Sequence, residues 1–176
     1  MVEQLGKIRL LLLDVDGVMT DGRIVIDNHG VETKAFDVKD GHGLKLLQRT
    51  GLKVGIITGR ESEVVRFRAR ELGIDILRQG AKSKLEPYLE VIGALGLRDE
   101  EVAYMGDDIV DLPILRRVGF AATVADAVEE VKPLVHYVST RCGGRGAVRE
   151  VCDLILKTTG RWPEVTDRYF AGADGP

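Results

Sequence analysis

The sequence predicts an α/β protein: a three-layer α/β/α sandwich around a mostly parallel, Rossmann-like sheet. Short runs of branched apolar residues, typical of strands buried on both faces, alternate with amphipathic segments of helix length. Over 176 residues this alternation indicates one domain with right-handed crossovers between parallel strands. Two carboxylates, Asp14 and Asp16, directly follow the first apolar run, where α/β proteins place their ligand sites.

The composition excludes several classes of function. The 25 basic and 28 acidic residues are intermixed, and aromatic residues make up 5% of the chain, so we expect no nucleic-acid partner. The first apolar run is too short for a signal peptide and no segment has the length of a membrane span, so we expect no membrane association. Cys142 and Cys152 lack metal-binding spacing, which indicates reduced thiols in a cytoplasmic protein.

The first strand is expected at residues 10–13, and an insertion interrupts the pattern after it. Residues 23–27 and 31–37 alternate apolar and polar side chains around Asn28-His29-Gly30, which predicts a β-hairpin over about 23–37. The remaining elements alternate regularly. We expect strands at 53–57, 74–77, 102–105, 119–124 and 136–138, and helices at 40–49, 61–72, 83–95, 110–118, 125–131 and 147–158.

The sequence divides into a domain over 1–160 and a C-terminal tail over 161–176. The tail contains Trp162, Tyr169 and Phe170 but shows no clear period. Two interpretations stay open for it: a disordered segment, or one whose aromatic side chains dock on a neighbouring subunit.

Residues capable of chemistry follow four of the predicted strands. They are Asp14 and Asp16, Thr58, Lys84 after a loop, and Asp107 with Asp108. In a parallel sheet these strand ends meet at one edge, where several carboxylates together need a hard cation such as Mg²⁺. A bound cation, a lysine and a hydroxyl are together suited to a phosphate group.

Each of these signals also has a structural interpretation. Two aspartates one residue apart commonly form a turn, Thr58-Gly59 can cap a helix, a lone lysine is usually solvated, and Asp107 or Asp108 can cap the following helix. Their common placement just after strands favours a shared site.

The motifs resemble those of the haloacid dehalogenase superfamily. The matching segments are 14–22 (DVDGVMTDG), 57–60 (ITGR), Lys84 and 106–111 (GDDIVD). The hairpin in place of a cap domain is similar to the capless branch. Gln79-Gly80 and 143–152 (GGRGAVREVC) resemble phosphatases of that branch which act on an eight-carbon sugar acid phosphate for lipopolysaccharide synthesis. The resemblance implies a homotetramer.

It also implies roles for individual residues in a Mg²⁺-dependent phosphomonoesterase. Asp14 is the nucleophile that forms an aspartyl-phosphate, and Asp16 is the general acid and base. Asp14, the Asp16 carbonyl and Asp107 hold the metal, with Asp108 or Asp111 in support. Thr58 and Lys84 share the charge of the phosphoryl oxygens.

The substrate depends on other residues. Arg60 and Arg68 are candidates for the sugar carboxylate, with Gly59 and Lys84 beside the phosphate, although Arg68 can equally serve a surface role. Arg145 either reaches a pocket or makes a tight turn. Related phosphatases for nine-carbon sialic-type acids carry Glu where this chain has Arg60, which favours the eight-carbon acid.

Two other classes of protein match part of this pattern. A signalling receiver domain also gathers acidic residues, a hydroxyl and a lysine around Mg²⁺, but it lacks an acid/base aspartate two residues beyond its phosphorylated one. A non-enzymatic scaffold would not require the full set of Asp14, Asp16, Thr58, Lys84 and Asp107.

Overall fold

The chain is described by a computed structural model over residues 2–171, built on a six-stranded sheet in the order β5-β4-β1-β6-β7-β8. Every neighbouring pair in this sheet is parallel. The strands are β1 (Leu10–Leu13), β4 (Lys53–Ile57), β5 (Ile76–Arg78), β6 (Val102–Met105), β7 (Phe120–Thr123) and β8 (Tyr137–Val138). The predicted fold class is confirmed.

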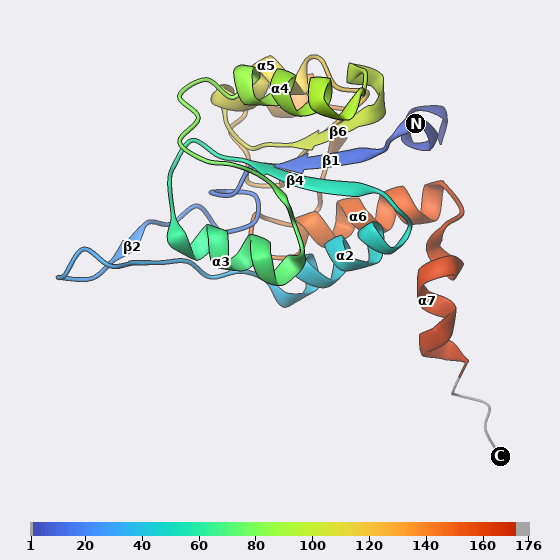
Figure 1. Ribbon diagram of the computed structural model, residues 1–176, viewed down its shortest axis with the longest axis horizontal. Helices are drawn as coiled ribbons and strands as arrows, with labels where there is room; N and C mark the ends of the chain where they lie inside the picture. Colours follow the sequence, from blue (N-terminus) through green and yellow to red (C-terminus); the bar gives the residue numbers. More distant parts are fainter. Residues whose placement is uncertain (1, 172–176) are drawn as a thin grey trace.

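Helices cover both faces of the sheet, which makes three layers (Figure 1). One face carries α4 (Leu85–Leu95) and α5 (Leu112–Leu115), and the other carries α2 (Val38–Arg49), α3 (Glu63–Leu72) and α6 (Ala147–Thr158). A 3-10 helix, η1 (Asp99–Glu101), leads into β6. These layers leave the carboxyl ends of the strands uncovered by helices.

The central position of β1 follows from its four leucines, all fully buried. Side chains alternate across a strand, so Leu11 and Leu13 join the apolar core beneath α2 and α6, while Leu10 and Leu12 join the core beneath α4 and α5. Because β4 and β6 pair with β1 on either side, the chain leaves β1 at the middle of the sheet edge. Asp14 is the first residue at that edge.

The hairpin is present but its strands are shorter than expected. β2 (Val25–Ile26) and β3 (Glu32–Thr33) pair antiparallel as a separate two-stranded ribbon that projects from the body of the domain (Figure 1). The Asp27 carboxylate accepts hydrogen bonds from the backbone N–H groups of His29 (2.8 Å) and Val31 (2.9 Å), so the turn takes up residues expected in the strands.

Two predicted helices are wrong: one is shorter than expected and the other does not form. The segment 110–118 forms a 3-10 helix, η2 (Ile109–Asp111), followed by the single turn of α5. The segment 125–131 is not helical; the 3-10 helix η3 (Lys132–Leu134) follows it. There the N–H groups of Ala125 and Val128 donate to the distant carbonyls of Arg141 and Asp107, which replaces the bonds a helix would make.

The chain ends add two helices that the sequence did not predict, α1 (Val2–Lys7) and α7 (Trp162–Phe170). In the tail, the Lys157 ammonium lies 4.6 Å from the centre of the Trp162 ring, and Arg49 donates to the Tyr169 hydroxyl at 2.8 Å. The tail therefore packs on its own chain as far as residue 171; residues 172–176 lie outside the described range. Across that range, no helix has the length and apolar character needed to cross a membrane.

Candidate active site

The carboxyl ends of β1, β4 and β6 border a cavity of about 190 Å³. The lining residues are Asp14, Asp16, Thr58, Gly59, Arg60, Lys84, Asp107, Asp108 and Val110. Of the residues predicted for the site, all except Arg68 and the supporting Asp111 line this cavity. Thr58 is buried directly after β4, with its N–H bonded to the Arg78 carbonyl (2.9 Å).

Asp14 is a buried carboxylate with a cation beside it. Its backbone N–H donates to the Met105 carbonyl (3.0 Å), so the ladder between β1 and β6 fixes where the side chain begins. Its Oδ2 lies 2.9 Å from the Lys84 ammonium. Burial raises the pKa of Asp14 to about 6; Lys84 opposes the shift and Asp111 adds to it. A carboxylate in this position needs positive charge in order to stay ionised.

Lys84 precedes α4 and is only 5% exposed, which rules out a solvated surface lysine. Its ammonium bridges Asp14 and Asp111, with 2.7 Å to the Asp111 Oδ1. Burial alone would lower the pKa of Lys84, but the two carboxylates outweigh burial and raise it. Lys84 is therefore a fixed positive charge in the lining of the cavity.

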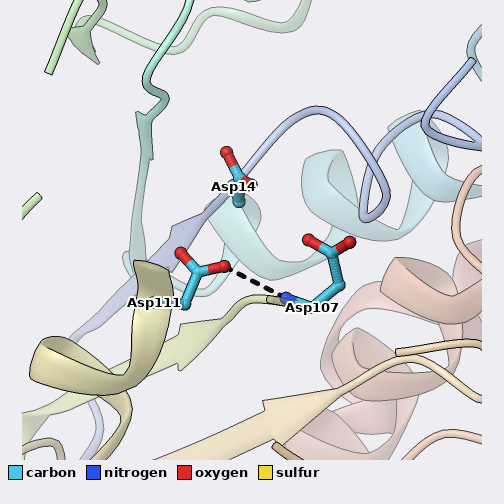
Figure 2. A group of neighbouring side chains, drawn as sticks. All are labelled: Asp14, Asp107 and Asp111. Carbon is cyan, nitrogen blue, oxygen red and sulfur yellow. Dashed lines mark hydrogen bonds between the residues drawn. The ribbon is translucent and has the colours of Figure 1, made fainter. Parts of the chain in front are cut away.

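Asp111 is fully buried and all of its acceptor positions are used. Its Oδ1 accepts from Lys84 and from the Tyr104 hydroxyl (2.5 Å), and its Oδ2 accepts from the backbone N–H groups of Asp107 (3.2 Å) and Asp108 (3.3 Å). Figure 2 shows the bond to the Asp107 N–H. With four donors around it, Asp111 organises the loop after β6 and has little capacity left for a metal ion.

Asp107 differs from Asp111 because its carboxylate is not fully hydrogen-bonded by the described residues. Its Oδ1 is buried and has no hydrogen-bond partner among residues 2–171. Burial, with the charges of Asp14 and Asp111, raises the pKa of Asp107 to about 7. A side chain on Gly17 would collide with the Asp107 carboxylate, so the glycine of the first motif makes room for it.

These carboxylates fit a divalent cation. Oxygens of Asp14, Asp107 and Asp111 lie within 4.8 Å of one another (Figure 2), and one buried Asp107 oxygen has no partner in the described part of the chain. An all-oxygen donor set of this kind suits Mg²⁺. Because the acceptor positions of Asp111 are used, Asp14 and Asp107 are the side chains free to coordinate. Asp108 is exposed at the rim, where its Oδ1 accepts from the Ile109 N–H (2.6 Å).

Asp16 is contacted by the hairpin, a connection that the sequence did not predict. The Lys34 ammonium lies 2.5 Å from the Asp16 Oδ1 and 3.3 Å from the Glu32 Oε1. Glu32 also accepts from Arg60 (2.8 Å) and from the Ser62 hydroxyl (2.6 Å). These bonds, that from Ser62 above all, lower the pKa of Glu32. The sequence contains one indication of the pairing between Glu32 and Lys34: they lie two residues apart, and therefore on the same face of an extended strand.

The two candidate arginines lie in different places. Arg60 lines the cavity, with its Nε 3.7 Å from the Asp16 Oδ2. Arg68 pairs with Glu71 of its own helix, α3, at 2.8 Å and stacks over Phe36 at 5.6 Å, and it does not line the cavity.

The glycine-rich loop at residues 143–146, before α6, packs against the backbone of the first motif, residues 14–22. A side chain on Gly143 would collide with the Gly17 carbonyl, and the Gly144 N–H donates to the Val18 carbonyl (3.0 Å). Arg145 is exposed and reaches Asp21 at 3.6 Å. It lines a separate cavity of about 460 Å³ and does not line the site cavity.

A buried carboxylate beside a lysine, a hydroxyl and oxygen ligands for a cation is the arrangement expected of hydrolases that transfer phosphoryl groups to aspartate. The family model described as haloacid dehalogenase-like hydrolase matches residues 41–119. Two curated relatives are named 3-deoxy-D-manno-octulosonate 8-phosphate phosphatase KdsC. The one from Yersinia pestis is 49% identical over 88% of this chain and 83% of its own. The one from Escherichia coli K12 is 46% identical over 90% and 84%.

Solved structures agree with these relatives. The crystal structure of 3-deoxy-D-manno-octulosonate 8-phosphate phosphatase from Moraxella catarrhalis, in complex with a magnesium ion, a phosphate ion and KDO, superposes with a TM-score of 0.91. It is 41% identical and covers 97% of this chain and 95% of its own. The chain therefore belongs to the haloacid dehalogenase-like hydrolases, in the family of the 3-deoxy-D-manno-octulosonate 8-phosphate phosphatases.

Proposed function

We propose that this chain is a Mg²⁺-dependent phosphatase that hydrolyses 3-deoxy-D-manno-octulosonate 8-phosphate to the free sugar acid and phosphate, in lipopolysaccharide precursor synthesis. The observation that carries the proposal is the buried Asp14 carboxylate, held 2.9 Å from Lys84 in a cavity shared with Asp16 and Thr58. Family membership supports the choice of substrate.

In the first half of the proposed reaction, an Asp14 carboxylate oxygen attacks phosphorus and the bond from phosphorus to the sugar oxygen breaks. The departing oxygen takes the electron pair and receives a proton from Asp16. In the second half, water attacks the aspartyl-phosphate, Asp16 takes the water's proton, and the bond from phosphorus to Asp14 breaks. Lys84 and Thr58 would face the phosphoryl oxygens throughout, because both line the cavity beside Asp14.

Asp14, Asp107 and the Asp16 carbonyl are the proposed metal ligands, with Asp108 at the rim. Mg²⁺ bound there supplies positive charge to the phosphoryl group during transfer. The unpartnered Asp107 oxygen and the raised pKa of its carboxyl support this assignment, since both would be relieved by a cation.

Arg60 is the proposed contact for the sugar carboxylate. It lines the cavity and already holds a carboxylate, that of Glu32, at 2.8 Å. We do not assign this role to Arg68, because within the chain it is directed to Glu71 and Phe36.

The remaining expectations are a cytoplasmic location and a homotetramer. The free cysteines, Cys142 and Cys152, suit a reducing compartment. The hairpin exposes Ile24, Val25, Ile26 and Val31, each more than half accessible, which suits contact with other subunits. Light scattering after size-exclusion chromatography tests the tetramer, and a monomeric mass would contradict it.

The substrate is tested by phosphate release with Mg²⁺ from three compounds: 3-deoxy-D-manno-octulosonate 8-phosphate, a nine-carbon sialic-type acid 9-phosphate, and a sugar phosphate without a carboxylate. We expect the highest kcat/KM with the eight-carbon acid, and loss of turnover by on the order of 10⁴-fold or more in Asp14→Asn. Equal activity on all three would remove the substrate assignment, and near-normal turnover by Asp14→Asn would overturn the mechanism.

Arg60→Ala, with Arg68→Ala as the matched control, tests the carboxylate contact. Losing a charged hydrogen bond should raise KM for the sugar acid by about 10-fold or more. Arg60→Ala should leave KM for the sugar phosphate without a carboxylate nearly unchanged. The same effect from Arg68→Ala would show that the assignment to Arg60 is wrong.

A further inference from the structure

The hairpin contributes a buried cation to the site, and the proposed reaction above does not use it. The Lys34 side chain is 1% exposed although it is carried by an insertion whose neighbouring residues 31 and 33 are exposed. Burying an ammonium is costly unless it is paired and hydrogen-bonded. Lys34 has two such partners, Asp16 at 2.5 Å and Glu32 at 3.3 Å.

Lys34 is the closest charged partner of Asp16. The other cation near Asp16 is Arg60, whose Nε is 3.7 Å away, beyond hydrogen-bond distance, and whose side chain is 44% exposed. A short contact from a buried lysine restricts the Asp16 carboxylate far more than a longer contact from an exposed arginine.

Glu32 holds Lys34 in place. Its carboxylate is shared by Lys34, Arg60 and the Ser62 hydroxyl, and Ser62 is the buried residue at the start of α3. The Ser62 side chain makes no capping bond to its own helix and bonds to the hairpin instead. The hairpin is thereby tied to the body of the domain where Lys34 meets Asp16.

We propose that Lys34 is a positioning residue for the phosphatase reaction: by holding one Asp16 oxygen, it directs the other toward the leaving oxygen of the substrate. This inference rests on the proposed function, because it assigns Lys34 a role through the general acid. Lys34 itself need not touch the substrate. The hairpin then serves the chemistry of its own chain.

The dependence of the rate on the leaving group tests this role. A sugar alkoxide needs a proton as it departs, whereas the p-nitrophenolate of p-nitrophenyl phosphate leaves as a stable anion. The value of kcat/KM reports the steps up to and including departure of the leaving group. We expect Lys34→Met to lower kcat/KM on the sugar acid phosphate by on the order of 10²-fold, as for a misplaced catalytic group. The value on p-nitrophenyl phosphate should change little.

Three further proteins complete the experiment. Asp16→Asn should also lower kcat/KM more on the sugar acid phosphate than on p-nitrophenyl phosphate, and by a larger factor than Lys34→Met. Lys132→Met, which breaks a remote surface pair with Glu129, should change neither value. Lys34→Gln replaces Lys34→Met if the latter does not fold, since it keeps a polar group in the buried position, and the same difference between the two substrates is expected of it.

Equal losses on both substrates, a change confined to KM, or unchanged kinetics would each overturn the role of Lys34. The wild-type protein separates this result from the proposed function. If the wild type is active and Asp14→Asn is not, the phosphatase stands whatever Lys34→Met does.

Discussion

Two sides of the site differ in their balance of charge. On the sheet side, within residues 2–171, three carboxylates (Asp14, Asp107 and Asp111) share one cation, Lys84, and an Asp107 oxygen is left without a partner. On the hairpin side, the two carboxylates of Asp16 and Glu32 face the two cations of Lys34 and Arg60. The sheet side therefore requires a cation from outside the chain, and the hairpin side does not.

The difference separates two tasks. The excess negative charge on the sheet side favours binding of a metal ion, and it makes the folded protein less stable when no metal ion is bound. Matched charges on the hairpin side hold side chains in fixed orientations. Burial alone does not distinguish the tasks, since Asp14 and the Lys34 side chain are both buried; the balance of charge around each group does.

The largest effect should come from Asp111, whose four donors make it the structural centre of the sheet side. In Asp111→Asn the amide NH2 must face two donors, either Lys84 and Tyr104 or the N–H groups of Asp107 and Asp108, and the negative charge beside Lys84 is lost. We expect a loss of about 3–5 kcal/mol in the free energy of unfolding. Urea denaturation without metal measures it, with Asp107→Asn as the matched control. An equal loss in that control would contradict the distinction between the two aspartates.

A smaller effect is expected from the metal itself. Mg²⁺ at 100 times its dissociation constant should stabilise the wild type by about 2.7 kcal/mol. Glu32→Gln, on the hairpin side, should keep this gain, and Asp107→Asn should lose most of it. Unfolding in Mg²⁺ and in EDTA gives the comparison, and a full gain in Asp107→Asn would place the cation elsewhere.

The smallest effect, taken per pH unit, concerns pH in the absence of metal. In the folded chain the pKa values of Asp14 (about 6) and Asp107 (about 7) exceed the value of about 3.9 for an unfolded aspartate. The folded state binds more protons between about pH 4 and 7, so its stability should fall as pH rises through that range, by on the order of 1–3 kcal/mol per pH unit. The loss is complete above the folded values.

Unfolding in EDTA at a series of pH values measures this slope. Asp107→Asn should flatten it, and Glu32→Gln should not, because the pKa of Glu32 is shifted in the other direction. Identical slopes in the wild type and Asp107→Asn would show that Asp107 is not the source.

The sequence was informative where local periodicity decides the outcome. The leucine run of β1 had to be buried, and a buried parallel strand must end at the edge where Asp14 begins. The same reasoning placed Thr58 and Asp107 after their strands. It failed for 125–131, where backbone bonds to distant carbonyls replaced helical ones, and for α7, whose stability depends on packing.

By itself, the sequence determined the α/β class, the edge of the sheet that carries the site, and the aspartates and lysine gathered there, because the spacing of apolar residues fixes which segments are buried and where they end. The tertiary structure decided how those groups are shared: that Asp111 is saturated while Asp107 is not, and that Lys34 reaches Asp16. Pairing between charges 18 residues apart depends on how the intervening turn folds, and no local period encodes that geometry.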